Sequence, residues 1–368
     1  MEDLWKPLLD NTTLAALLQR LNDITPSQWC QAYYLFAAGA VVAVAAMPNE
    51  VSRRLVDYGA RKVQSVKVSR SGSRSSEGKE ENDTGRGTGS EAEVKAKANR
   101  VERGGDKNWL LSLTDTLTSY GQVPHSWFIT FYVASMACSL LWFWQFAVDG
   151  RVLRVVTCSQ ASPTAKGGDE RGGVSASSVT LGQVGLAWTM MFLQGSRRLY
   201  EDSLVHGKSK STMWIVHWVL GLSYYLFTSV AVWVEGSGAI LEYQSTGAID
   251  YTMPSFKSLV GTFMFLYASV NQYRCHRHLA GLKKYSLPDL GLFRYLICPH
   301  YFCECLVYLS LAIVAAPQGE LLNKTLLCAL VFVVVNLGVT AAGTRKWYAE
   351  KFGSKAVETK WDMIPFIL

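Results

Sequence analysis

"NKTLLCALVFVVVNLGVTAAG", residues 323–343, carries no charged side chain after Lys324. A helix that crosses the hydrocarbon of a bilayer needs about 20 mostly apolar residues, and this stretch has that length. It runs almost directly into "RKWYAEKFGSKAVETKWDMIPFIL", residues 345–368, which begins basic and aromatic and ends apolar. The two stretches together predict a membrane span followed by a charged segment that has to leave the bilayer.

Six further stretches share the length and apolar character of this one. Of the 368 residues, 49% are hydrophobic and 18% are charged, whereas soluble domains average about 25% charged residues. Trp and Tyr flank several of the stretches, as they do at membrane interfaces. The sequence therefore predicts an all-α, polytopic membrane protein with about seven transmembrane helices. The predicted spans are 29–48, 126–148, 177–196, 213–235, 256–272, 296–316 and 323–343.

The basic residues predict how this bundle is oriented. Alternate loops, 49–125, 197–212, 273–295 and 344–368, hold 14, 4, 5 and 5 Lys and Arg residues, 28 of the 36 in the chain, whereas the opposite loops hold 6. Positive charge accumulates on the cytosolic side of membrane proteins. We therefore expect a lumenal N-terminus and a cytosolic C-terminus. The net charge of +7 is explained by this topology, and no nucleic-acid partner is expected.

The chain divides into three predicted parts. Residues 1–48 hold an N-terminal segment and the first span, 49–125 form a cytosolic loop, and 126–368 form the main membrane domain. Within the loop, residues 68–107 are rich in Gly, Ser, Lys and Glu and contain no aromatic residue, so they predict a disordered insert.

No metal centre is expected, because Cys303 and Cys305 would point to different faces of a helix.

Two polar segments next to spans are candidates for binding phosphates. In "QGSRRLYEDSLVHGKSKSTM", residues 194–213, Glu201 follows Arg197 and Arg198 by one helical turn and could orient them. In "NQYRCHRHLAGLKK", residues 271–284, Gln272, His276 and Lys283 would fall near one helix face. Guanidinium and ammonium groups bind phosphates by charge-assisted hydrogen bonds. The alternative for both segments is anchoring to anionic lipid headgroups.

Two further features point to the same side of the bundle. Glu304 is an acid close to a span, where a charge is costly, so it is a functional candidate unless it only pairs with Arg294. In the tail, Arg345, Lys346, Tyr348 and Lys360 could cover a nucleotide. Residues 364–368 would then be buried and would hold the tail on the bundle. The alternative is a tail that grazes the membrane.

Taken together, "QGSRRLYE", "HGKSKSTM", "NQYRCHRHLAGLKK", "CPHYFCE" and "RKWYAEKF…IPFIL" resemble the steroid 5α-reductase family, and within it the polyprenol (polyprenal) reductase branch. The resemblance runs over roughly residues 107–368. It implies seven helices, NADPH bound on the cytosolic side, and hydride transfer to a polarised C=C bond. The NADPH contacts that it implies are Gln272, His276, Lys283, His300, Glu304, Tyr308, Tyr348 and Lys360.

Departures from the steroid enzymes indicate the substrate. Their catalytic Tyr falls on Gly195 here, and their substrate-binding Glu falls on Phe131, beside Tyr132. Hydride addition to an isolated double bond leaves a carbanion, whereas an α,β-unsaturated aldehyde places that charge on oxygen, where a donor stabilises it. The expected reaction is therefore reduction of the α-isoprene double bond of polyprenal. The resemblance implies where and why it takes place: in the endoplasmic reticulum membrane, for dolichol and protein N-glycosylation. Tyr132 is the first candidate proton donor and His206 the second.

The expected partners are a long-chain polyprenoid and membrane lipid, with no obligate protein partner. Three other classes of enzyme stay open: a trans-2-enoyl-CoA reductase, which "RRLYEDSLVHGKSKSTM" also resembles, a steroid 5α-reductase, and a SAM-dependent methyltransferase. The methyltransferase motif Arg-His-Pro-x-Tyr is broken by the order Cys298-Pro299-His300-Tyr301. A seven-helix receptor or transporter would carry functional polar residues deep in its spans, whereas here they gather at one edge.

Overall fold

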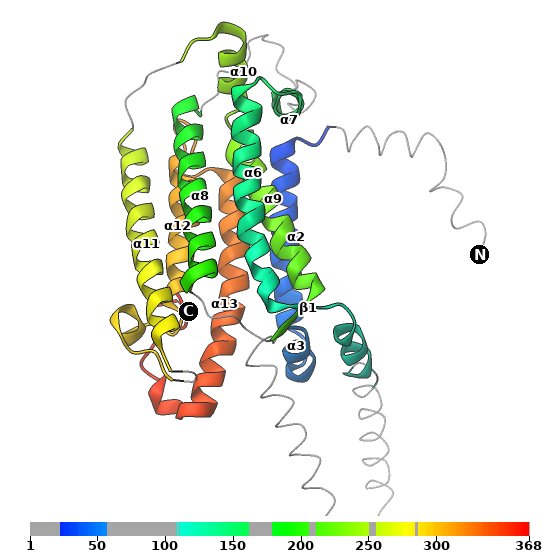
Figure 1. Cartoon of the computed structure of the whole chain (residues 1–368), viewed down its shortest axis with the longest axis vertical. Coiled ribbons are helices and arrows are strands. Elements are labelled where there is room, and N and C mark those ends of the chain that lie inside the picture. The colour runs from blue at the N-terminus through cyan, green and yellow to red at the C-terminus, as the bar shows by residue number, and fades with distance from the viewer. Residues whose placement is uncertain are drawn as a thin grey trace, which may run out of the picture. The chain divides into compact units, whose positions relative to one another are not determined.

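The computed structural model describes residues 23–56, 109, 111–161, 179–205, 211–249, 255–283 and 286–367. Helices dominate this part of the chain, which confirms the predicted all-α class (Figure 1). The predicted insert at 68–107 and the candidate donor His206 lie outside the described residues.

A helix lies at each of the seven predicted spans. These helices are α2 (Pro26–Ala45), α6 (Ile129–Ala147), α8 (Leu181–Tyr200), α9 (Ile215–Val234), α11 (Phe256–Gly281), α12 (Pro299–Val314) and α13 (Lys324–Phe352). Within the described residues, four helical stretches are long and apolar enough to cross a membrane: α2, His125–Ala147, α9 and α13. The helix α12 is apolar but shorter. The count of seven spans and the orientation of the termini stay predictions.

Shorter elements connect these helices, and the contacts divide the chain into two compact units. The connecting elements are α3 (Asn49–Val56), β1 (Gln122–Pro124), η3 (His125–Phe128), α7 (Arg151–Ala161), the π-helical turn η5 (Glu201–Val205), β2 (Thr212–Trp214), α10 (Ser237–Thr246), η6 (Gly291–Arg294) and η7 (Ser354–Ala356). The second unit, Val41–Phe128 and Lys208–Leu220, contains the antiparallel pair β1–β2, in which Val123 faces Met213. The first unit, Met1–Ala40, Ile129–Gly207 and Gly221–Leu368, contains most of the helices.

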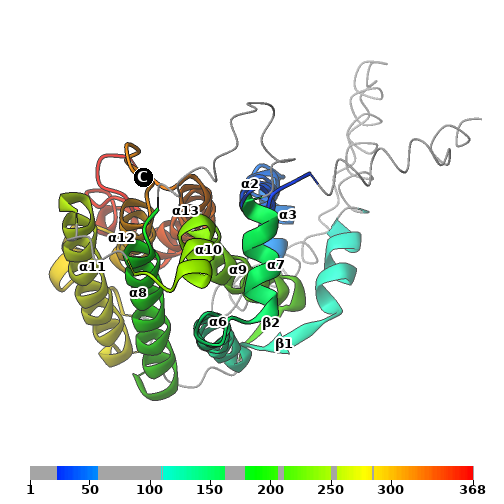
Figure 2. The same ribbon diagram turned by 90° about the horizontal axis from the view of Figure 1, so that it is seen from above.

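Within the first unit, α11 and α12 pack closely along their length (Figure 2). Gly261 makes this approach possible, because a Cβ atom there would lie 2.6 Å from Val314 Cγ2 and 3.1 Å from the carbonyl oxygen of Ser310. Small residues serve this purpose at helix interfaces in membranes. The two helices that carry Gln272 and Glu304 are therefore held at a fixed separation.

The carbonyl groups at the C-terminal end of α12 are capped by side chains from three other helices. Gln183 of α8 donates to the carbonyls of Val314 and Ala316, at 2.8 and 3.0 Å, and the ammonium of Lys257 also donates to Ala316. Asn323, which is fully buried, donates to the carbonyl of Ala315 at 2.9 Å. Helix ends that lack water need such partners. The buried amide of Asn323 is therefore engaged inside the protein and is not accessible for glycosylation.

The C-terminal tail folds back and is clamped. Arg345 of α13 donates to the carboxylate of Asp362 and to the carbonyls of Val357 and Lys360. The amides of Ile297 and Cys298 donate to the carbonyls of Trp361 and Asp362, at 2.8 and 2.9 Å. Met363 is fully buried. The tail is therefore attached to the segment that leads into α12.

The expectation that residues 364–368 are buried is wrong, because Ile364 and Pro365 are only half-buried and the next two residues are exposed. The side chains of Phe366 and Ile367 are 84% and 74% exposed, and Leu368 lies outside the described residues. The physical reason is that the clamp is polar: the Arg345–Asp362 ion pair and the backbone hydrogen bonds hold the tail without using its apolar end.

We expect Asp362→Ala to destabilise the folded protein by about 1–3 kcal/mol, because Arg345 would lose its carboxylate partner while remaining partly buried. The control is Glu358→Ala, which removes an exposed carboxylate four residues away. Thermal unfolding of both variants in the same detergent checks this. Equal unfolding midpoints for the two would show that the ion pair does not hold the tail.

Candidate functional site

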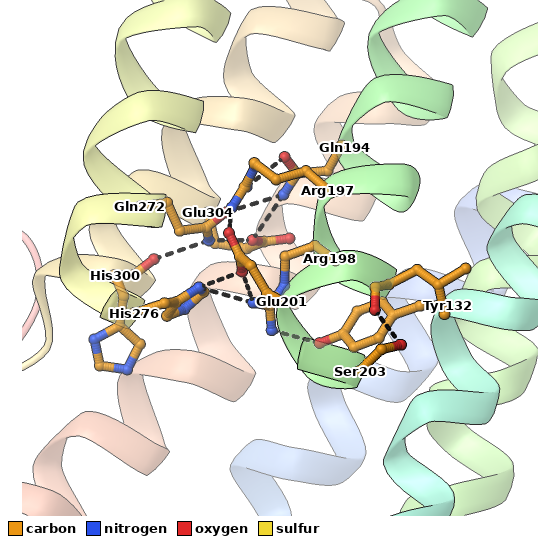
Figure 3. A network of polar contacts seen from close by, with 11 residues as sticks. Tyr132, Gln194, Arg197, Arg198, Glu201, Ser203, Gln272, His276, His300 and Glu304 are labelled. Atoms are coloured by element: carbon orange, nitrogen blue, oxygen red, sulfur yellow. Dashed lines mark hydrogen bonds and ion pairs between the residues drawn. The ribbon is translucent and has the colours of Figure 1, made fainter. Parts of the chain in front are cut away.

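Polar side chains from α6, α8, η5, α11 and α12 meet in one network inside the first unit (Figure 3). Ionisable groups within a helical bundle are costly and are found where they serve a function. The network therefore marks the candidate site. Its members are Tyr132, Gln194, Arg197, Arg198, Glu201, Gln272, His276 and Glu304.

Glu201 is the centre of one half of the network. Its side chain has no exposed surface, and its carboxylate accepts hydrogen bonds from Arg197, Arg198 and His276 Nδ1, the last at 2.6 Å. Burial opposes ionisation of this carboxyl, but the hydrogen bond and charge of His276 and the two guanidinium groups lower its pKa to about 2. Glu201 is therefore a carboxylate throughout the physiological pH range.

Arg198 links this carboxylate to a phenol on another helix. One of its terminal nitrogens contacts Glu201 and lies 2.8 Å from His276 Nδ1. Its other terminal nitrogen donates to the hydroxyl of Tyr132, and the guanidinium carbon lies 4.8 Å from the centre of the Tyr132 ring. Tyr132 lies on α6 and is only 3% exposed. Arg198 therefore holds the Tyr132 hydroxyl in place.

The other half of the network is built from two amides and a second carboxylate. The Gln194 side-chain nitrogen donates to Gln272 Oε1 at 3.1 Å and to Glu304 Oε2 at 3.2 Å. Gln272 also donates to Glu304, and to the carbonyl of His300 at 3.1 Å. Arg197 donates to both amide oxygens. Each amide thus accepts from a guanidinium and donates to a carboxylate, which fixes its orientation.

The structure brings together several of the predicted cofactor residues. Gln272 and His276, one turn apart on α11, both lie in the network with Glu304. The ring of His300 lies 5.6 Å from that of His276. Tyr308, one turn beyond Glu304 on α12, is buried, and its ring lies 5.7 Å from that of Tyr224. Glu304 contacts Gln194 and Gln272, and Arg294 is exposed.

Three predicted cofactor residues lie elsewhere in the described part of the chain. Lys283 was expected to share a face with Gln272, but α11 ends at Gly281, so Lys283 follows the helix and is exposed. Lys360 lies in the tail clamp, 3.4 Å from the carbonyl of Pro288, and burial lowers its pKa. Tyr348 packs beside the rings of Trp347 and Phe352 on α13.

Residues 194–213 were predicted as a phosphate-binding segment, separate from residues 271–284. The orientation of Arg197 and Arg198 by Glu201 was visible in their spacing and is confirmed. The contact between Arg198 and Tyr132 and the role of Gln194 were missed. No spacing rule relates residues on different helices, so the sequence held no signal for these two contacts.

Two nitrogen atoms in and near the network are available to donate hydrogen bonds to a ligand that is rich in acceptor oxygens. The Nε atom of Arg197 and the Nε2 atom of His278 are buried and lack a hydrogen-bond partner within the described residues. Arg274 and Arg277, on the same end of α11, are exposed. An anionic nucleotide offers phosphate and amide oxygens for such groups. In the described ranges no three His, Cys, Asp or Glu side chains gather as they would around a metal ion.

Comparison with known proteins shows what the chain is similar to. Residues 207–368 match the family of 3-oxo-5-alpha-steroid 4-dehydrogenases. The polyprenal reductase of Xenopus tropicalis is 31% identical over 193 residues, which are 50% of this chain and 60% of that protein. The polyprenal reductase of Saccharomyces cerevisiae is 31% identical over 184 residues, 50% of this chain and 64% of that protein.

Lower identity accompanies a longer match in a plant relative. Polyprenal reductase 1 of Oryza sativa subsp. indica is 26% identical over 286 residues, 67% of this chain and 79% of that protein. The chain thus matches less than two thirds of the length of the relatives from Xenopus and yeast. These matches confirm the resemblance to the family and to its polyprenal reductases.

We expect Glu201→Gln to lower stability at neutral pH by about 3 kcal/mol, because two guanidinium groups and His276 would lose their common carboxylate. In the wild type, the pKa of Glu201 is depressed from 4.5 to about 2. Its contribution to stability is therefore present above about pH 4.5 and is lost as the pH falls toward 2. Unfolding midpoints measured from pH 6 down to pH 3 should converge for the wild type and Glu201→Gln.

The control is Glu242→Gln, because Glu242 is exposed on α10. Its unfolding curve should follow that of the wild type at every pH. A constant gap between the wild type and Glu201→Gln down to pH 3 would contradict the ionised, ion-paired state of Glu201.

Proposed function

We propose, from the premise that residues 207–368 form a domain of the 3-oxo-5-alpha-steroid 4-dehydrogenase family, that this protein is a polyprenal reductase. It uses NADPH to reduce the α-isoprene double bond of polyprenal to dolichal. Relatives named polyprenal reductase in a frog, a yeast and a plant support this proposal. The helices that are long enough to span a membrane suit an isoprenoid substrate.

The observation that carries the proposal is the Tyr132 hydroxyl held by Arg198 beside the Glu201–His276 pair. When bound, NADPH supplies the hydride to the β-carbon of the enal. The electron pair of the double bond then moves onto the aldehyde oxygen as an enolate, and the α-carbon takes a proton. Tyr132 donates this proton, and Arg198 stabilises the negative charge left behind.

We further propose that the same network helps to hold the cofactor. Gln272, His276, His300, Glu304 and Tyr308 form the part of the cofactor site next to the proton donor. The amide and carboxylate of Gln272 and Glu304 are suited to hydroxyl and amide groups, and the unpartnered Nε of Arg197 to an anionic oxygen. Lys283, Tyr348 and Lys360 contact more distant parts of the nucleotide.

The choice between polyprenal and polyprenol as substrate follows from where the negative charge goes after hydride transfer. Reduction of polyprenol would leave a carbanion with no oxygen to receive the charge, whereas the aldehyde of polyprenal accepts it. The proposed role is to provide dolichol for protein N-glycosylation, and the proposed location is the endoplasmic reticulum membrane. Both rest on the similarity to polyprenal reductases.

A direct test follows NADPH absorbance with purified protein in detergent and four substrates in parallel: polyprenal, polyprenol, a 3-oxo-4-ene steroid and a trans-2-enoyl-CoA. We expect oxidation of NADPH with polyprenal alone. Turnover with the enoyl-CoA or the steroid instead would assign the protein to another branch. If the folded protein does not bind NADPH, the proposal that it is an NADPH-dependent reductase is wrong.

We expect Tyr132→Phe to lower kcat for polyprenal about 10²–10⁴-fold, because the phenylalanine ring keeps the packing but has no proton to give. The Kd for NADPH should change little. The control is Tyr33→Phe, which removes a hydroxyl that bonds to Ser223 on another part of the first unit. If Tyr132→Phe turns over polyprenal at the wild-type rate and His206→Asn does not, His206 is the donor.

A further inference from the structure

The clamped tail ends in exposed apolar side chains. Phe366 is 84% exposed, Ile367 74% and Trp361 41%, and the rings of Trp361 and Phe366 lie 5.6 Å apart. We call these three residues the C-terminal tip. The proposed reaction does not use the tip, and the segment before it is well anchored by Arg345 and Met363. An anchored segment that exposes apolar side chains is suited to bind an apolar surface.

The lengths of the last two helices place the tip along the bundle axis. The N–H of Asn323, just before α13, donates to the carbonyl of Ala312 near the end of α12, so these helix ends lie at one level. The helix α12 has 16 residues and α13 has 29, so at a rise of about 1.5 Å per residue α13 is longer by roughly 20 Å. It therefore extends beyond the start of α12.

Residues 353–362 return over this distance and end beside Ile297 and Cys298, which directly precede α12. The apolar helix α12 is about 24 Å long, somewhat less than a hydrocarbon thickness of about 30 Å. The tip therefore begins beside the start of an apolar helix of nearly membrane-spanning length.

The side chains around the tip are those of a membrane interface. Tyr295, whose carbonyl accepts the N–H of Trp361, is 67% exposed at the same level. Trp and Tyr are enriched where hydrocarbon meets headgroups. The bases Arg294 and Lys346, on neighbouring segments, are exposed.

We infer that the C-terminal tip is a membrane-docking element: Trp361, Phe366 and Ile367 insert at the edge of the acyl chains, and the nearby bases contact anionic headgroups. Basic side chains near an anionic membrane surface add to such binding. Docking would hold residues 295–298, which lead directly into His300 and Glu304. The inference concerns the tail alone and does not depend on the proposed reaction.

The test uses full-length protein in lipid nanodiscs, with an environment-sensitive fluorescent amino acid at position 366 and, in a second sample, at position 355. Phosphatidylcholine brominated near the carboxyl end of its acyl chains quenches from the membrane, and iodide quenches from water. We expect a blue shift and loss of emission by the brominated lipid at 366, and quenching by iodide at 355. Replacing a third of the lipid by phosphatidylserine should increase the quenching at 366, and added salt should reverse this increase.

Two results would overturn the inference. Quenching of position 366 by iodide to the same extent as position 355 would place the tip in water. Shielding of position 366 from both quenchers would place it against protein. A second pair of variants keeps the test independent of the label: Phe366→Glu should lose lipid protection of residues 361–367 in hydrogen exchange, whereas Phe366→Leu should retain it.

Discussion

The structure depends on one buried carboxylate. Glu201 cannot stay ionised without exposed surface unless cations surround it. It stays ionised because two arginines of α8, the helix directly before it, and a histidine of α11 converge on it. This convergence fixes the separation and rotation of α8 and α11. The second terminal nitrogen of Arg198 points away from Glu201 and donates to the Tyr132 hydroxyl of α6. Three helices are thus positioned by the demands of a single charge.

The remaining constraints hold this network from both ends. At one end, Gln183, Lys257 and Asn323 satisfy the last carbonyls of α12, so α8, α11 and α13 share a common anchor. At the other end, the tail clamp ties α13 to the residues just before α12. Glu304 lies between these two fixed ends. The proposed function, in which a cofactor, a lipid and a proton donor lie within bonding reach, would require this kind of rigidity.

Several features followed from the sequence because they are local. The apolar stretches located all seven helices. The ends of α8 shifted by four residues, from the predicted 177–196 to Leu181–Tyr200, whereas α11 and α13 each run nine residues beyond the predicted spans 256–272 and 323–343. The relation of Glu201 to Arg197 and Arg198 followed from the helical repeat, as did that of Gln272 to His276. The prediction misplaced Lys283 because it continued the helix past Gly281, although glycine favours the end of a helix and α11 stops there.

By itself the sequence determined which segments are helical, which polar residues share a helix face, and that the chain closes on an apolar end. Only the tertiary structure decided that Tyr132 meets Arg198, that Gln194 and Gln272 share Glu304, and that Phe366 and Ile367 remain exposed. The physical reason is that contacts within a helix are set by its 3.6-residue repeat. Contacts between apolar helices depend on their rotation and register, which polar bonds such as those of Glu201 select.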